Sequence, residues 1–333
     1  MARRPRVALI FTGGTIDSVG VDRLDMAWYI EAGKRLENGE LVARVPELAS
    51  VADVEEIPFR RLPSQSIRDR DLLDLVALIH RIFDEDRADG IVITHGTNTL
   101  EETAYFLHLT VKRDRPVVVV GAMRPASAIS ADGPLNLLNG VRVAAAPEAR
   151  GLGVLVVLNE AIHSARDVTK TATYRVDTFQ DRDLGPLGYA DNDGRVLIYH
   201  RPARAHTTQT EFDLAGIDGL PRVDVVVSYL GADGVMIDAA VAAGARGIVS
   251  AGTGAGRPTP GEEAALERAS AAGTIVVQGT RVGSGRTVSS PGLRRKGWSA
   301  ADNLQPWKAR VLLALALTRT SDVAEIQRMF DTY

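Results

Sequence analysis

Short apolar runs rich in β-branched residues recur along the chain, each bounded by glycine, proline or polar residues. Runs of this kind without polar alternation are typical of parallel strands covered by helices on both faces. Seven runs fit this pattern: 7–11, 91–94, 116–122, 153–158, 223–230, 247–252 and 274–279. The pattern therefore predicts buried strands at these places.

Amphipathic stretches with helical spacing of apolar residues lie between several of these runs. The helices that they predict cover 69–83, 99–110, 136–146 and 260–272. Strands that alternate with helices along one chain are characteristic of layered α/β folds. We therefore expect a larger N-terminal α/β domain with a mostly parallel sheet, followed by a smaller C-terminal α/β domain.

One long stretch, from Tyr199 to Pro221, is polar and turn-rich and has no strong periodicity. It is the best candidate for a connection between domains. The length of 333 residues also suits two domains of ordinary size. We expect an N-terminal catalytic domain over 1–203, a linker over 204–221 and a C-terminal domain over 222–333. The Arg-, Gly- and Ser-rich segment 281–297 is predicted to be a surface loop.

Composition and charge narrow the functional class. The net charge of -3 favours no electrostatic partnership with nucleic acid. No apolar run approaches the roughly 20 residues of a membrane span, and the basic start leads directly into a predicted strand rather than a signal sequence. We therefore expect a cytoplasmic protein. Because there is no cysteine, thiol nucleophiles and zinc–thiolate sites are excluded. His95, His108 and His163 lack metal-ligand spacing, so we expect neither metal nor cofactor.

The first predicted strand ends in the glycine-rich segment TGGTIDS. Gly13 and Gly14 permit backbone angles and close approaches that a β-carbon blocks. They present Thr15 at the carboxyl end of a strand, where open α/β sheets bind their ligands. The Thr15 hydroxyl is either a nucleophile or the cap of a turn, and this segment alone leaves both open.

A second strand end repeats this arrangement in the sequence HGTNTLEE, which begins at His95. Thr99 and Glu102 suit a capping box for the helix that follows, which is a structural role. Thr97 lies just before this cap, at a helix N-terminus whose amide groups favour developing negative charge. Two threonines that follow glycines at two strand ends indicate a catalytic site more strongly than either one alone.

Two further segments carry polar groups that have a structural and a chemical interpretation. Gly121 lies near the end of the run 116–122, and Asp132 leads into a helix. Here a structural turn in which an arginine holds the carboxylate is at least as good an interpretation as direct catalysis. Lys170 lies among threonines in RDVTKTAT. A lysine is normally solvated, but beside a hydroxyl and partly desolvated it can lose its proton and act as a base.

Taken together, these segments resemble the bacterial-type asparaginase/glutaminase family. The motifs TGGTI, ITHGTNTLEETAYFL, GAMRPASAISADGPLNL and RDVTK stand in the family's order and approximate spacing, as do GPLG and PWKARVLLALALTRT. The resemblance covers nearly the whole chain. It implies an amidohydrolase with two α/β domains, which acts on a small-molecule amide and forms a homotetramer of intimate dimers. Active sites in that family lie at the interface within each intimate dimer.

The resemblance also implies roles for single residues in catalysis. Thr15 matches the nucleophilic threonine, on the loop that closes over substrate. Thr97 matches the second catalytic threonine, and Lys170 the lysine that hydrogen-bonds it. Tyr29 lies about where the family has a lid tyrosine that supports the nucleophile. Which threonine is acylated does not follow from sequence; we favour Thr15, with Thr97 and Lys170 activating water or relaying a proton.

Substrate-binding residues follow in the same way. Ser64 and Gln65 resemble the pair that holds the carboxylate and amino groups of the substrate. The backbone N–H groups near Thr97 and Ala122 are the natural donors to an oxyanion. The remaining contacts are expected from the loops themselves, at Gly14, Gly96 and Asn98.

The sequence departs from the family where substrate charge is read. Asn98 stands where the family has an aspartate that binds the α-ammonium of asparagine. In the C-terminal domain, SSPGLRRKG contains no equivalent of a second family acid, and Ala255 stands where the family has an asparagine. We therefore expect a small carboxamide other than L-asparagine as substrate. The basic cluster 294–296 either adds to carboxylate binding or is exposed loop charge.

Three alternatives remain at this point. The first is a conventional L-asparaginase. The second is a catalytically silent amide-binding protein, against which the retained Thr15, Thr97 and Lys170 argue. The third is a dinucleotide-binding oxidoreductase. It is disfavoured because the nearest glycine-rich segment, GTGAGRP, has prolines at 258 and 260 that disrupt a phosphate-binding turn.

Overall fold

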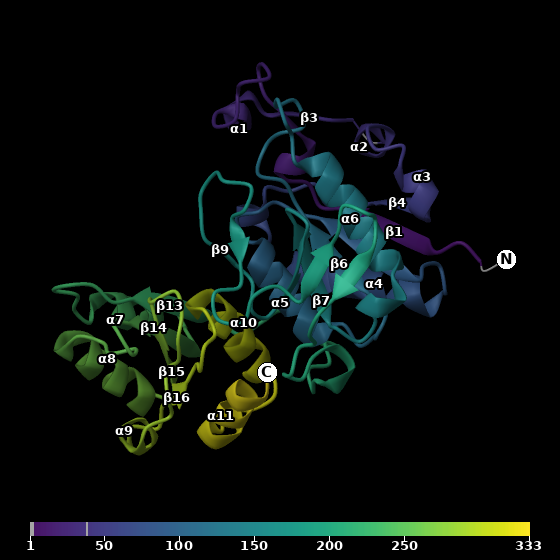
Figure 1. The fold of residues 1–333 in the computed structure, drawn as a ribbon. Helices are drawn as coiled ribbons and strands as arrows, with labels where there is room; N and C mark the ends of the chain where they lie inside the picture. The colour runs from purple at the N-terminus through teal and green to yellow at the C-terminus, as the bar shows by residue number, and fades with distance from the viewer. Residues whose placement is uncertain (1–2, 38) are drawn as a thin grey trace. The chain divides into compact units, whose positions relative to one another are not determined.

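A computed structural model describes residues 3–37 and 39–333 (Figure 1). The chain forms two compact units, Met1–Gln209 and Thr210–Tyr333. Each unit has a sheet and a hydrophobic core of its own. Among the described residues, no helix has the length and apolar character needed to cross a bilayer.

The sheet of the first unit has eight strands in the order β12-β11-β8-β7-β6-β5-β1-β4. The five strands from β7 to β4 run parallel, whereas β8, β11 and β12 are added antiparallel. The bounds are β1 Arg6–Phe11, β4 Asp53–Pro58, β5 Gly90–Thr94, β6 Val117–Val120, β7 Val154–Leu158, β8 Ala161–Ser164, β11 Gly188–Ala190 and β12 Val196–Ile198. The central strands β5, β6 and β7 are buried at every position, which explains their unbroken apolar sequences.

The long helices of this unit are α4 Asp69–Asp84, α5 Leu100–Thr110 and α6 Gly133–Ala145. Helices α5 and α6 pack on the strands, and α4 packs on α5. All three predicted helices of this domain are therefore present. Helix α6 begins three residues before the predicted start, at Gly133, because Pro134 fits the first turn of a helix, where no N–H partner is lost. Leu137 and Val141 of α6 join Val92, Val118 and Val157 of the sheet in one core.

Short elements connect the long ones. The short helices are α1 Tyr29–Ala32, α2 Glu40–Ala43 and α3 Leu48–Val51, and the 3₁₀ turns are η1 Thr15–Asp17, η2 Ser64–Ser66, η3 Pro147–Ala149 and η4 Thr207–Gln209. Two small antiparallel pairs complete the unit: β2 Ser18–Val19 with β3 Lys34–Arg35, and β9 Thr169–Lys170 with β10 Phe179–Gln180. The η4 turn lies within the predicted linker 204–221.

The second unit has a parallel four-stranded sheet in the order β13-β14-β15-β16. Its elements are β13 Val223–Val227, α7 Val235–Ala242, β14 Gly247–Gly252, α8 Pro260–Ala271, β15 Ile275–Thr280, α9 Pro291–Arg295, β16 Ser299–Ala300, α10 Pro306–Ala316 and α11 Val323–Thr332. Figure 1 shows α7 and α8 on one side of these strands and α10 on the other. The predicted fold class, two α/β domains of unequal size, is confirmed.

The prediction of a surface loop over 281–297 is wrong in part, because α9 lies inside it. Ser290 caps this helix by accepting a hydrogen bond from the Leu293 N–H at 3.2 Å, and Pro291 occupies its first turn. Serine followed by proline is a common start of a helix. The signal was present in the sequence, but the surrounding arginines, glycines and serines obscured it.

Candidate active site

The turn that carries Thr15 follows β1 directly. Gly13 and Gly14 both have positive φ, 93° and 118°, which residues with a β-carbon rarely adopt. A β-carbon on Gly14 would also lie 2.6 Å from the Cα of Gly96. The backbones of the first and second glycine loops are therefore in contact, and only glycine permits it.

The Thr15 hydroxyl has a hydroxyl partner on the short helix α1, which follows the turn in sequence. Its Oγ1 lies 2.9 Å from the hydroxyl oxygen of Tyr29, the first residue of α1. Burial raises the pKa of the Tyr29 phenol, and the hydrogen bond to Thr15 opposes that effect only in part. The phenol therefore stays neutral near neutral pH, as a group that both accepts and donates a hydrogen bond.

Thr97 is paired with Lys170. The Lys170 Nζ donates to Thr97 Oγ1 at 2.8 Å, and the Thr97 side chain is buried at the end of β5. Desolvation lowers the pKa of Lys170, while the negative charge of Glu101 acts to raise it. The lysine is thus half-buried beside a hydroxyl, which is the second of the two environments considered for it above.

Glu101 is a member of this group that sequence reasoning missed as a functional residue. It is buried in the first turn of α5, and its Oε1 accepts a hydrogen bond from the Lys170 backbone N–H at 3.0 Å. A glutamate in a first helical turn reads from sequence as a favourable interaction with the helix dipole. Its contact with Lys170 arises only because β9 crosses that turn.

Residues expected to bind substrate gather around the second loop. Asn98 Nδ2 donates to Gln65 Oε1 at 3.2 Å. A β-carbon on Gly96 would lie 2.8 Å from the Oγ of Ser64, so the η2 turn packs directly against this loop. Ser64 is buried, whereas Gln65 and Asn98 are exposed.

The predicted capping box at Thr99 and Glu102 is not formed. Thr99 is the N-cap of α5 but makes no capping hydrogen bond, because its hydroxyl donates to the Ser64 backbone oxygen at 2.8 Å. The contact ties the η2 turn to the start of α5. Thr99, which the sequence indicated as a local helix cap, therefore links two segments that are far apart in sequence.

The third loop abuts Thr97. A β-carbon on Gly121 would lie 3.0 Å from Thr97 Cγ2, and Ala122 is fully buried next to it. The suggested arginine–carboxylate contact is wrong: Asp132 accepts hydrogen bonds from the backbone N–H groups of Met123 and Arg124, the shortest 2.9 Å. The Arg124 guanidinium instead donates to a backbone oxygen. Backbone donors reach the carboxylate because the turn folds back on the start of α6.

These loops lie at the carboxyl ends of β1, β5 and β6, neighbours in the parallel part of the sheet. The first unit therefore brings together two hydrogen-bonded pairs, Thr15 with Tyr29 and Thr97 with Lys170, beside Ser64. Within the described ranges 3–37 and 39–333, no group of three or more acidic, His or Cys side chains is arranged to hold a metal ion.

Two family models match this chain. Residues 6–204 match the model of the N-terminal domain of asparaginase, and residues 222–330 match that of the glutaminase/asparaginase C-terminal domain. The two matches follow one another and cover most of the chain. It belongs to the asparaginase family.

Individual relatives resemble this asparaginase-family chain along nearly its whole length. It is 44% identical to L-asparaginase 2 of Bacillus subtilis over 99% of this chain and 87% of that protein. It is also 44% identical to L-asparaginase 2 of Escherichia coli, over 99% and 93%, and 40% identical to a glutaminase-asparaginase of Pseudomonas fluorescens, over 98% and 90%. Among solved structures, the probable cytoplasmic L-asparaginase of Campylobacter jejuni superposes with a TM-score of 0.90 at 41% identity, covering 99% of this chain and all of that one. The chain is an amidohydrolase of the asparaginase type, which hydrolyses amide C–N bonds.

The basic cluster 294–296 has partners within the second unit. Lys296 forms ion pairs with Glu263 and Glu267 of α8, and its ammonium lies 5.0 Å from the centre of the Trp298 ring. The Arg294 guanidinium donates to the Ser289 backbone oxygen at 2.6 Å. The charge of Lys296 is therefore balanced locally, which removes one cation from the suggested carboxylate site.

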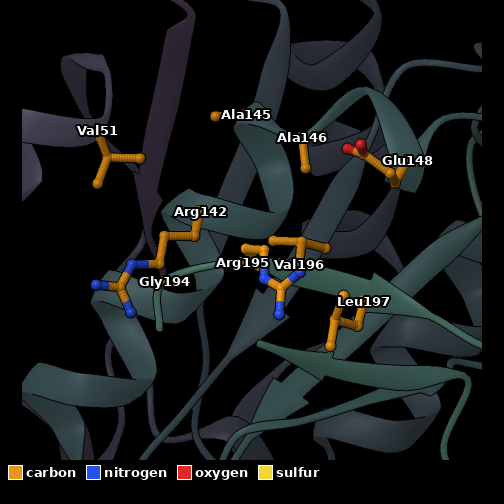
Figure 2. Close-up of a pocket in the computed structure, with 9 residues that line it drawn as sticks. All are labelled: Val51, Arg142, Ala145, Ala146, Glu148, Gly194, Arg195, Val196 and Leu197. Carbon is orange, nitrogen blue, oxygen red and sulfur yellow. The ribbon is translucent and has the colours of Figure 1, made fainter. Parts of the chain in front are cut away.

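The first unit also has a groove that is separate from the residues expected at the active site. The groove has a volume of about 530 Å³ and is lined by residues at the end of α6 and in the turn that leads into β12. Figure 2 shows Arg142 and Arg195 among the side chains that line it. Arg195 pairs with Asp193 at 2.5 Å, and Arg142 donates to Asn139 at 3.0 Å. None of the expected catalytic or substrate-binding residues lines it.

Proposed function

We propose that this chain hydrolyses a small carboxamide through Thr15, with a specificity shifted away from L-asparagine. The observation that carries the catalytic part is the pairing of each threonine hydroxyl with its own partner, Tyr29 for Thr15 and Lys170 for Thr97. A threonine hydroxyl is a weak nucleophile until a neighbour accepts its proton, so a hydrogen-bonded partner is what the chemistry requires.

The reaction has two halves. In the first, Thr15 Oγ1 bonds to the amide carbon while its proton is relayed through Tyr29 to the nitrogen, and the C–N bond breaks to release ammonia. Backbone N–H groups near Thr97 and Ala122 stabilise the oxyanion. In the second half, water activated at Thr97 and Lys170 attacks the ester and frees the carboxylate and Thr15. Gly14 and Gly96, expected among the substrate contacts, also let the two loops approach this closely.

The specificity part rests on Asn98. Its amide donates to Gln65, so this position has a neutral group with a donor where an ammonium-binding carboxylate is required. An uncharged amide oxygen forms a weaker hydrogen bond with an ammonium than a carboxylate does, by about 1 to 2 kcal/mol. Since SSPGLRRKG supplies no acid either, an α-ammonium is a poor fit, while Ser64 still offers a hydroxyl to a carboxylate.

Conventional L-asparaginase activity is the second candidate. It is favoured by the 44% identity to two proteins named L-asparaginase 2. The two candidates differ in one measurable ratio, the kcat/KM for L-asparagine against that for an amide of the same length without the amino group.

Steady-state kinetics with L-asparagine, succinamate and a panel of simple amides test the proposal. We expect kcat/KM for succinamate to exceed that for L-asparagine by roughly tenfold, which corresponds to about 1.4 kcal/mol. A higher value for L-asparagine contradicts the shifted specificity and establishes the second candidate.

Two variants test the threonine mechanism with the best amide of that panel. We expect Thr15→Ala to abolish ammonia release and Thr97→Ala to lower kcat by a factor on the order of 10³. Ammonia release that survives in Thr15→Ala contradicts the nucleophile assignment. If the wild type releases no ammonia from any amide, the chain is a silent amide-binding protein.

We also propose a cytoplasmic homotetramer built from intimate dimers. The resemblance to the probable cytoplasmic L-asparaginase of Campylobacter jejuni over the full length supports the compartment, and family membership supports the assembly. Sedimentation equilibrium gives a mass near four times 35.7 kDa if the assembly is correct. A monomer at micromolar concentration contradicts it.

A further inference from the structure

Residues 20–33, here called the Tyr29 loop, lie between β2 and β3 and carry the Tyr29 hydroxyl to Thr15. The loop buries few apolar side chains, since Val21, Leu24 and Trp28 are all exposed. Two hydrogen bonds join it to a neighbouring segment, from the Gly20 N–H to Ser127 Oγ at 2.7 Å and from the Ile129 N–H to the Arg23 backbone oxygen at 2.8 Å. A segment that buries few apolar side chains opens at a low free-energy cost. The closed position of Tyr29 therefore depends also on how the base of the loop is fastened.

The two strands at that base are too short to fasten it alone. Strands β2 and β3 pair over only two residues each, Ser18 with Arg35 and Val19 with Lys34. An isolated two-stranded ribbon is marginally stable in water even when it is longer. One further backbone hydrogen bond extends the pairing, from the Leu36 N–H to the Asp17 backbone oxygen at 2.8 Å.

Arg61 spans the same two residues with its side chain. Its Nε and Nη2 donate to Asp17 Oδ2 at 3.0 and 2.6 Å, and Nη2 also donates to the Leu36 backbone oxygen at 2.8 Å. Asp17 is only 4% exposed. A buried carboxylate is tolerated when it is paired, and removing its partner leaves an uncompensated charge.

The backbone at Arg61 and Leu62 is held by β3 and by Thr12, the residue that follows β1. The Arg61 carbonyl oxygen accepts a hydrogen bond from Arg35 Nη1 at 3.2 Å, and the next residue, Leu62, donates to the Thr12 backbone oxygen at 3.1 Å. Ser64 follows three residues after Arg61. One side chain therefore connects the Thr15 turn, the base of the Tyr29 loop and the segment that carries Ser64.

We propose that Arg61, through its ion pair with Asp17, is a positioning residue that keeps the Tyr29 hydroxyl against Thr15. The inference rests on the proposed function, since it concerns how Thr15 is presented for attack. Arg61 itself touches no reacting atom.

Arg61→Gln and Asp17→Asn test the proposal, with Arg60→Gln as the matched control. Arg60 is the neighbouring residue and is also an arginine with two carboxylate partners, but these are Asp71 and Asp74 of α4. Hydrogen exchange of peptides covering 18–36, measured by mass spectrometry, reports opening of the loop. We expect faster exchange there and a fall in kcat of roughly ten- to a hundredfold for both test variants, with KM less affected. Arg60→Gln keeps the wild-type values of both.

Wild-type exchange over 18–36 and wild-type kcat in Arg61→Gln overturn the proposal. If a single variant fails to fold, the double variant Asp17→Asn/Arg61→Gln decides, because it removes both charges of the pair and leaves no buried charge without a partner. A folded double variant with fast exchange and low kcat supports the proposal, and one with wild-type kcat overturns it. Failure of the proposed function shows itself elsewhere, as ammonia release that survives in Thr15→Ala, and leaves the exchange measurement standing.

Discussion

At Lys170 two opposing influences meet on one ammonium group. Desolvation lowers its pKa below the ordinary lysine value of 10.5, and the nearby Glu101 carboxylate opposes that effect. In the proposed mechanism the neutral amine is the active form in the second half of the reaction, so kcat rises with pH as Lys170 loses its proton. Because the pKa is lowered, this rise begins at a lower pH than for a solvated lysine.

Glu101→Gln removes the influence that raises the pKa of Lys170. We expect the rising limb of the profile of kcat against pH to move to lower pH in this variant, measured from about pH 6 to 10. Glu102→Gln, which changes the next residue in the same helical turn, is the control and leaves the limb in place. A limb that moves to higher pH in Glu101→Gln contradicts the assignment.

Asn98 offers a second prediction at the scale of one residue. Asn98→Asp restores a carboxylate at the position where an α-ammonium is read. We expect kcat/KM for L-asparagine to rise relative to succinamate by roughly ten- to a hundredfold, the range of a charge-assisted hydrogen bond. Asn98→Ala removes the amide without adding charge and should not raise this ratio. An unchanged ratio in Asn98→Asp shows that the position does not read substrate charge.

At the scale of elements, the contact between the two glycine loops sets how closely the ends of β1 and β5 approach each other. Gly14 lies against the backbone of Gly96. The two loops cannot move apart unless the end of β1 or of β5 shifts as well. We expect Gly14→Ala to lower kcat/KM on the order of a hundredfold, because the loops must move apart.

Gly151→Ala is the matched control for that substitution. Gly151 also has positive φ, 67°, but a β-carbon there meets nothing within 4 Å. It should carry the conformational cost of about 1 kcal/mol in the free energy of unfolding, with normal kinetics. Equal kinetics in the two variants would show that loop contact is unimportant.

Local signals predicted the long helices of the first unit and α8 well, but they did not predict α10 and α11 of the second unit. The buried strands and the helices α4, α5 and α8 lie close to their predicted bounds, because an apolar pattern over several turns is a strong signal. Thr99 and Ser290 show where such reasoning fails. The hydroxyl of Thr99 bonds to a distant segment instead of its own helix, and the helix begun by Ser290 is only five residues long.

For the molecule as a whole, His95 makes stability depend on pH. It is fully buried at the end of β5, and desolvation lowers its pKa from 6.5 to about 4. Between these values the unfolded chain binds a proton that the folded chain does not. This contribution to stability is therefore complete above pH 6.5 and is lost as the pH falls toward 4, by roughly 3 kcal/mol in the free energy of unfolding.

Urea unfolding of wild type and His95→Asn at pH 7 and pH 5 measures this term. Asparagine keeps an N–H near the position from which the imidazole Nδ1 contacts the Gly96 oxygen, at 2.8 Å in the wild type, but it does not titrate. We expect the loss of stability at pH 5 to be smaller in His95→Asn than in the wild type. An equal loss assigns the acid sensitivity to other groups.

By itself the sequence determined the two α/β domains, the threonines that follow glycine loops and the absence of an acid at Asn98. Each of these depends on residue type and local spacing, which a chain carries before it folds. Only the tertiary structure decided that Tyr29 meets Thr15, that Glu101 meets Lys170 and that Arg61 joins Asp17 to Leu36. These contacts join residues 14 to 69 positions apart, and no local pattern encodes them, because they form only when the loops and the small antiparallel pairs have folded against the ends of the sheet strands.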